Sequence, residues 1–74
     1  MKRTEMEVLR ADGYTKQEAE RLLKNGGFVV GIEEIDDIAE TYGTTREEIE
    51  SGNADGIHVS HYAEGETYLI CSFN

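Results

Sequence analysis

Glycine divides this chain into short segments, and proline is absent from it. Eight glycines stand among 74 residues, and the intervals between them leave room only for short helices and strands. Glycine readily ends a helix or forms a tight turn, because it adopts positive φ without strain. The chain is therefore expected to fold as several short elements packed into a single small domain, residues 1–74.

Two threonine-capped segments open the chain. Thr4 with Glu7, and then Thr15 with Glu18, have the spacing of a capping box, in which the two side chains satisfy free N–H groups at the start of a helix. A glycine follows each segment and ends the predicted helix. No internal repeat is evident.

The middle of the chain predicts one short strand and two further helices. The run "FVVGI", residues 28–32, is β-branched and apolar and predicts a strand. Residues 33–43 place Ile35, Ile38, Ala39 and Tyr42 on one face of a helix. Residues 44–52 predict a short helix whose buried residue is Ile49.

The last eighteen residues predict a β-hairpin. "IHVSHY" and "TYLICSF" read as strands, and "AEGE" fits a three-residue loop with Gly65 at positive φ. This register pairs Tyr62 with Glu66 and Val59 with Leu69. It places two sets of side chains on opposite faces: Ile57, Val59, Leu69, Cys71 and Phe73 on one, and His58, Ser60, Tyr62, Tyr68, Ile70 and Ser72 on the other. The predicted fold class is α+β, with about four helices, a short strand and a C-terminal β-hairpin, giving a three-stranded antiparallel sheet.

The hairpin also holds both histidines and the only cysteine of the chain. His58 and His61 are three positions apart, so on a strand they point to opposite faces and do not converge on a metal ion. Cys71 is expected to be a small buried hydrophobe, and the histidines to be surface residues. Neither a phosphate-binding glycine loop nor a calcium loop is present. We therefore expect no metal site, no cofactor and no enzymatic activity.

Charge is the strongest functional signal. The net charge is −9, and residues 26–74 hold eleven acids and one base, Arg46. Such a field repels phosphate and anionic lipid and attracts a basic partner. Acidity that serves solubility alone, with an apolar partner surface elsewhere, stays open as an alternative. The predicted partner-binding residues are the acids of the third and fourth helices: Glu33, Asp36, Asp37, Glu40, Glu47, Glu48 and Glu50.

The stretch "IDDIAETYGTTREEIESG" resembles the helix-turn-helix family. The resemblance is carried by Ala39, Gly43 and Ile49, with two isoleucines upstream. The element order also resembles a winged helix over residues 15–73, with "AEGE" as the wing, and implies a DNA-binding or transcription accessory factor. The sequence departs from the family in charge, because its second helix, "TTREEIE", has one Arg and three Glu, whereas a DNA-reading helix needs basic or amide side chains. Two routes to DNA binding stay open: the basic N-terminal segment contacts phosphate, or a partner supplies the positive charge.

The segments "GYTKQEAERLLKNG" and "DGIHVSHYAEGETYLICSF" resemble small acidic proteins of bacterial phages and mobile elements. This resemblance implies a host-interaction role, such as that of inhibitors that imitate nucleic acid, anti-CRISPR proteins among them. The predicted function is a small acidic protein-binding module whose partner is a basic surface, in particular that of a nucleic-acid-binding protein. The winged-helix factor is the alternative. With no signal peptide and no membrane span, a cytoplasmic location is expected. The oligomeric state stays open, a homodimer included.

Overall fold

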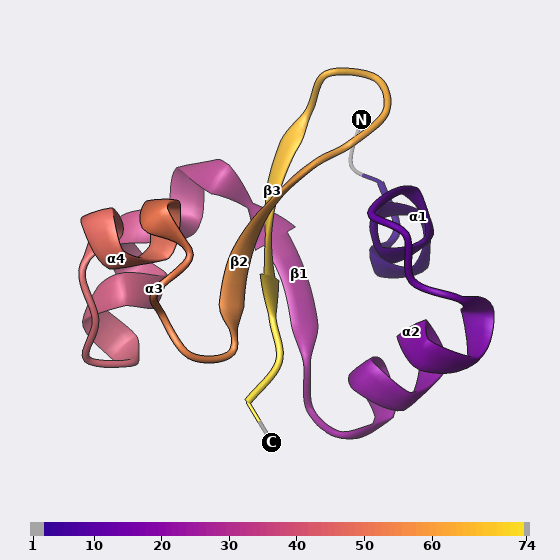
Figure 1. Cartoon of the computed structure of the whole chain (residues 1–74), viewed down its shortest axis with the longest axis horizontal. Helices are drawn as coiled ribbons and strands as arrows, with labels where there is room; N and C mark the ends of the chain where they lie inside the picture. The colour runs from indigo at the N-terminus through magenta and orange to yellow at the C-terminus, as the bar shows by residue number, and fades with distance from the viewer. Residues whose placement is uncertain (1–2, 74) are drawn as a thin grey trace.

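A three-stranded antiparallel sheet forms the middle layer of the molecule, and a pair of helices covers each of its faces (Figure 1). The computed structural model describes residues 3–73. In chain order the elements are α1 (Glu5–Ala11), α2 (Lys16–Lys24), β1 (Phe28–Gly31), the 3-10 turn η1 (Ile32–Glu34), α3 (Ile35–Thr41), α4 (Arg46–Ser51), β2 (Ile57–His61) and β3 (Thr67–Cys71). Within these residues the predicted α+β fold is confirmed, with its four α-helices and its three antiparallel strands.

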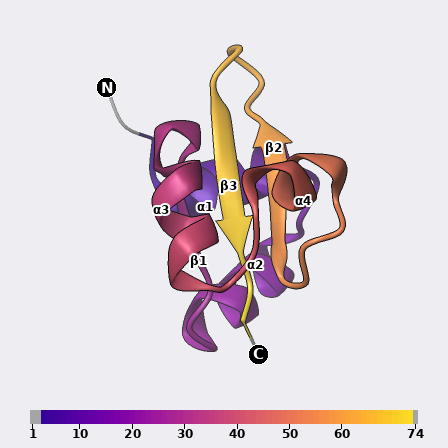
Figure 2. The ribbon, with the colours of Figure 1, turned by 90° about the vertical axis from the view of Figure 1, so that its left-hand side faces the viewer.

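The hairpin forms in the predicted register. Val59 lies opposite Leu69, and the N–H of Tyr62 donates to the carbonyl of Glu66 at 2.6 Å. Gly65 has a φ of 87°, and its N–H donates to the Tyr62 carbonyl at 2.9 Å, which closes the three-residue loop. β3 also pairs with β1, so the strand order is β1-β3-β2 and the last strand is central (Figure 2).

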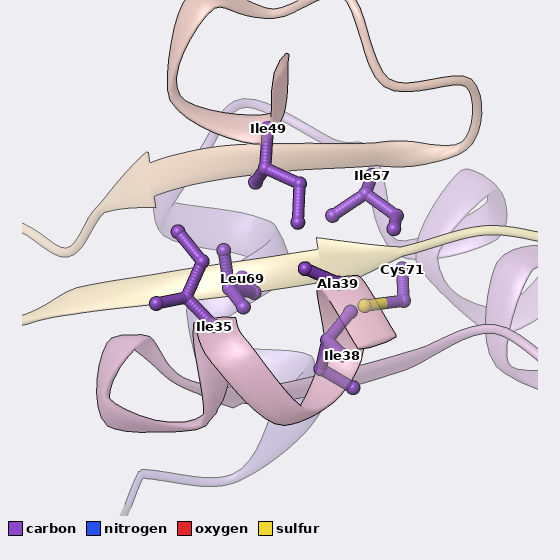
Figure 3. Packing of buried hydrophobic residues seen from close by; sticks show 7 residues of the cluster. All are labelled: Ile35, Ile38, Ala39, Ile49, Ile57, Leu69 and Cys71. Carbon is purple, nitrogen blue, oxygen red and sulfur yellow. The ribbon is translucent and has the colours of Figure 1, made fainter. Parts of the chain in front are cut away.

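Side chains of β3 alternate between two hydrophobic clusters. Leu69 and Cys71 point toward α3 and α4, where they meet Ile57 of β2, so the predicted apolar face is confirmed (Figure 3). Ile70 points the other way. Its cluster lies under α1 and α2 and has four buried members: Leu9, Ala19, Leu22 and Ile70. The sequence placed Ile70 on the opposite face correctly but did not predict that a helix pair buries it.

The third predicted helix begins later than expected. Glu33 and Glu34 lie in the 3-10 turn, and α3 starts at Ile35. No side chain caps this start, whereas Thr45 caps α4 by accepting from a backbone N–H in its first turn. Tyr42 was expected to face inward. It lies instead at the C-cap of α3, is 43% exposed, and stacks on the ring of Phe73 with 3.8 Å between centroids.

The order of the elements repeats in the structure, although the sequence shows no evident repeat. α1, α2 and β1 recur as α3, α4 and β2, and the helical positions are related by an offset of 30 (13 to 43, 15 to 45). Both helix pairs turn in the same way: the N–H of Tyr14 donates to Leu9 at 3.0 Å, and that of Thr44 to Ala39 at 2.9 Å. The repeat is hard to see in the sequence because few of the paired helical positions are identical: Gly13 and Gly43, Thr15 and Thr45, Glu18 and Glu48, and Glu20 and Glu50.

Candidate functional site

The predicted acidic residues all lie on one side of the sheet, on and around α3 and α4. Three come from α3 and three from α4, and Glu33 precedes them in η1. The two helices are held together by buried isoleucines, including Ile38 and Ile49, so their polar sides face outward. Every one of the seven predicted residues is exposed. We call the outward side of α3 and α4 the acidic face.

Arg46 is the only base on the acidic face within residues 3–73. Its Nη1 lies 3.5 Å from Asp36 Oδ2, and its Nε lies 3.7 Å from Glu50 Oε2. Both contacts are solvent-exposed, so each is worth at most about 1 kcal/mol. They still spread the guanidinium charge over two carboxylates, which makes Asp36 and Glu50 less available to a partner.

Two other predicted residues sit at the ends of the acidic face, in separate hollows. The Glu33 carboxylate lies against Gly31 in a hollow of about 520 Å³ beside β1. Glu48 lines a second hollow of about 310 Å³ with Asp55, and its carboxylate accepts from the Thr45 hydroxyl.

Three of the predicted residues remain open for an incoming partner. Within the described chain, Asp37, Glu40 and Glu47 make no ion pair and no side-chain hydrogen bond. All three are exposed. We call them the open carboxylates, and they are the part of the predicted site that the structure leaves available.

The repeat separates charge between the two faces of the sheet. Residues 3–27, with α1 and α2, carry five bases and five acids, whereas residues 28–73 carry one base and eleven acids. Equivalent positions differ in sign: Arg10 stands in the last turn of α1, and Glu40 in the last turn of α3. One architecture thus occurs twice, once with balanced charge and once strongly acidic.

The sequence did not predict a cluster of charged and aromatic residues at the hairpin tip. Arg3 pairs with Glu64 and, at 3.1 Å, with Glu66, and its guanidinium lies 5.1 Å from the centre of the Tyr62 ring. Tyr68 donates its hydroxyl to Glu66 at 2.9 Å, and this bond together with Arg3 lowers the pKa of Glu66. More than sixty residues separate the partners in the chain, so no local pattern signals the cluster. It also engages Arg3, one of the N-terminal bases considered for phosphate contact.

The two histidines have separate partners. His58 Nε2 lies 3.1 Å from Asp12 Oδ2, and its ring stacks on Tyr14 at 6.4 Å between centroids. His61 Nδ1 lies 3.3 Å from the hydroxyl of Thr67 on the neighbouring strand. Residues 3–73 contain no group of three or more His, Cys, Asp and Glu side chains able to hold a metal ion.

Cys71 is buried in the cluster beneath α3 and α4, and burial raises the pKa of its thiol from 9.0 to about 11. Between these values the folded chain keeps a proton that the unfolded chain loses. The thiol's contribution to stability is thus present below pH 9 and is lost as the pH rises to about 11.

We expect the free energy of unfolding to fall by about 2 kcal/mol more between about pH 8 and about pH 10.5 in the wild type than in Cys71→Ala. Urea unfolding of both proteins at the two pH values measures this difference. Equal losses in the two proteins would contradict it, because tyrosine and lysine titration is common to both.

A comparison of the chain with known protein families, with curated proteins and with solved structures finds no match. Among the helices of residues 3–73, none has the length and apolar character needed to cross a membrane. Function is therefore inferred from the geometry and charge of this molecule.

Proposed function

We propose that this protein is a non-enzymatic binding module whose acidic face docks on the basic surface of a nucleic-acid-binding protein and competes there with nucleic acid. The observation that carries the proposal is the charge contrast between the two repeat units. Each unit packs a pair of short helices against one face of the sheet, yet only the second is strongly acidic. The architecture does not need the acids, so a partner is the stronger explanation for them.

One acid of α3, Glu40, lowers the stability of the helix, whereas Asp36 and Asp37 lie in the first turn, where the helix dipole favours negative charge. Glu40 lies in the last turn, where the helix dipole disfavours negative charge by about 0.3–1 kcal/mol. It is also one turn from Asp36 and Asp37, and each such like-charge pair costs about 0.2–0.5 kcal/mol. At the equivalent position of α1, Arg10 carries a positive charge, which the helix dipole favours in the last turn. A small domain that carries these costs in only one of two repeat units is consistent with selection for binding.

The open carboxylates resemble a phosphate backbone in sign and in their spacing along a surface. On α3 they stand about one helical turn apart, with Cβ atoms roughly 5–6 Å from each other. A groove lined with lysine and arginine for nucleic acid presents cations that such a row can pair with. The resulting complex would exclude nucleic acid from the groove, which is the action of an inhibitor of the kind that phages and mobile elements carry.

The winged-helix alternative has the order of its elements in its favour. Against it stands the chemistry of the surfaces that would meet DNA. α4 has six residues, and its single arginine is shared between Asp36 and Glu50. The hairpin tip carries Glu64 and Glu66. Without cations to neutralise phosphates, affinity for duplex DNA is low at physiological salt.

The test removes the open carboxylates together: Asp37→Asn, Glu40→Gln and Glu47→Gln. We expect the variant to keep its fold, to melt within a few degrees of the wild type, and to bind the partner about tenfold or more weakly with a flatter salt dependence. Partners are captured from a cell lysate, identified by mass spectrometry, purified, and titrated at several salt concentrations in the presence and absence of duplex DNA.

The control variant changes the net charge by the same amount as the test variant but leaves the acidic face unchanged. Ala11→Lys, Gln17→Lys and Glu20→Gln add the same three units of charge at exposed positions of α1 and α2. This variant should bind nearly as the wild type does. Binding that survives removal of the open carboxylates with its salt slope intact would show that the acidic face is not the interface.

A further inference from the structure

The outer edge of β2 has unpaired backbone groups. Tyr62 and Gly56, on either side of the strand, bond to the residues that flank β3: the N–H of Tyr62 donates to Glu66 and the carbonyl of Gly56 accepts from Ser72, each at 2.6 Å. Backbone groups alternate direction along a strand, so those of Val59 and His61 point away from β3. Within residues 3–73, no group hydrogen-bonds to the N–H of either residue.

The opposite edge of the sheet is blocked. On β1 the N–H of Val29 points outward and donates to the carboxylate of Glu5 in α1 at 2.9 Å. α1 packs against this strand, so a fourth strand at this edge would have to displace the Glu5 carboxylate from the N–H of Val29. The two edges therefore differ: a side chain occupies the β1 edge, and the β2 edge is open.

The open edge lacks the features that prevent strand addition. Proteins protect exposed edges with lysine, proline, bulges or inward-pointing charges. β2 pairs with β3 in unbroken register from Ile57 to His61 and contains no Lys, Arg, Asp, Glu or Pro. His61 is exposed and Val59 only partly buried. An extended chain can therefore approach this half of the strand.

The helix that packs against β2 is acidic. α4 packs against β2 and lies beside it in Figure 2. The helix carries Glu47, Glu48 and Glu50, and only Arg46 opposes them. A second copy of the chain is a poor occupant, since pairing two β2 strands would bring together two chains of net charge −9 and their acidic helices. A cationic strand is the complementary one.

We propose that an extended, lysine- or arginine-rich segment of the partner adds to the outer edge of β2 as a fourth strand, with its side chains beside the carboxylates of α4. This inference rests on the proposed function and gives it a binding mode, in which backbone hydrogen bonds to Val59 and His61 supply register and the acidic residues select for positive charge.

The probe is a synthetic eight-residue peptide of alternating lysine and valine. Two control peptides accompany it: the same sequence with alternate backbone amides N-methylated, which cannot pair with a strand, and an alternating glutamate–valine peptide. Amide hydrogen exchange of the wild-type protein, with and without peptide, measures directly whether the outward N–H groups of β2 are hydrogen-bonded. Protection of the Val59 and His61 amides should rise about tenfold or more when the lysine peptide binds.

Two substitutions distinguish the contribution of the backbone N–H of His61 from that of its imidazole. His61→Pro removes an outward N–H and leaves the pairing of β2 with β3 intact, and His61→Ala removes the imidazole but keeps the N–H. We expect His61→Pro and N-methylation each to weaken binding about tenfold or more, and His61→Ala to weaken it about twofold or less. The exchange measurement on the wild type decides the matter if His61→Pro fails to fold.

Four other results would contradict either edge pairing, the selection for positive charge, or the choice of occupant. Binding that needs the open carboxylates but tolerates N-methylation and His61→Pro overturns edge pairing and leaves the proposed function standing. Equal binding of the glutamate and lysine peptides refutes charge selection at this edge, whereas the proposed function fails only if binding of the partner survives removal of the open carboxylates. A free protein that is already a dimer, with the amides of Val59 and His61 protected, shows that a second copy holds the edge. Absence of lysine-peptide binding at about millimolar concentration also overturns edge pairing.

Discussion

Replacing Ile70 by Ala is expected to lower the free energy of unfolding by about 2–5 kcal/mol. Ile70 is completely buried, and it is the only residue of β3 in the cluster beneath α1 and α2. Removing its side chain leaves a cavity bounded by both helices and by Val29 of β1. A chain of this length has about 4–11 kcal/mol of stability in all, so the loss is a large fraction of the total and the variant should unfold at a clearly lower denaturant concentration.

The matched variant is Leu69→Ala, one position earlier on the same strand. Leu69 is also completely buried, but it points into the cluster beneath α3 and α4. Because β3 is shared, each substitution should destabilise both helix pairs together and yield a single unfolding transition. Chemical denaturation followed by circular dichroism, with hydrogen exchange for each helix pair, measures this. Two separate transitions would contradict it.

Local chemistry made much of this fold predictable from the sequence. Thr4, Thr15 and Thr45 cap helices because their hydroxyls bond to a backbone N–H one turn later, which a three-residue spacing encodes. Gly65 fixes the loop length, and the loop length fixes the register of the hairpin. These signals lie within a few residues of each other, so they can be read without knowing the rest of the structure.

The features that could not be predicted from the sequence depend on contacts between residues far apart in the chain. The faces of β3 were predicted, but not which helix pair covers Ile70, since either pair offers an apolar side. The pairing of Arg3 with Glu64 and Glu66 joins the start of the chain to the tip of the hairpin, about sixty residues later. The repeat was missed because two segments can fold alike when their equivalent positions share only polarity. Identical residues are not needed at most of these positions.

The candidate site was predicted as a set of residues but not as an arrangement. All seven acids proved exposed, as expected. Their partners were not predictable, because the contact of Arg46 with Asp36 depends on how α3 and α4 pack. The difference between the edges of β1 and β2 was likewise hidden, since it depends on the side chain of Glu5 crossing from α1.

Replacing Gly27 by Ala is expected to cost about 3 kcal/mol of stability. A Cβ at this position would lie 2.8 Å from the carbonyl oxygen of Leu22 and 2.9 Å from that of Cys71. Both oxygens belong to the backbone, and the first already accepts the N–H of Gly27 at 2.9 Å. α2 and β3 would have to move apart to admit a methyl group, which would open the cluster around Leu22 and Ile70.

The neighbouring glycine supplies the control, because it is needed for a different reason. Gly26 has a φ of 92°, and a Cβ added there would meet only open space, so Gly26→Ala should cost only about 1–2 kcal/mol in backbone strain. Asparagine tolerates positive φ, so Gly26→Asn should recover part of that loss, whereas Gly27→Asn should be at least as damaging as Gly27→Ala. Thermal unfolding of the four variants tests both reasons at once. If Gly27→Ala melts within a few degrees of the wild type, the close approach of α2 to β3 is not what holds the first helix pair against the sheet.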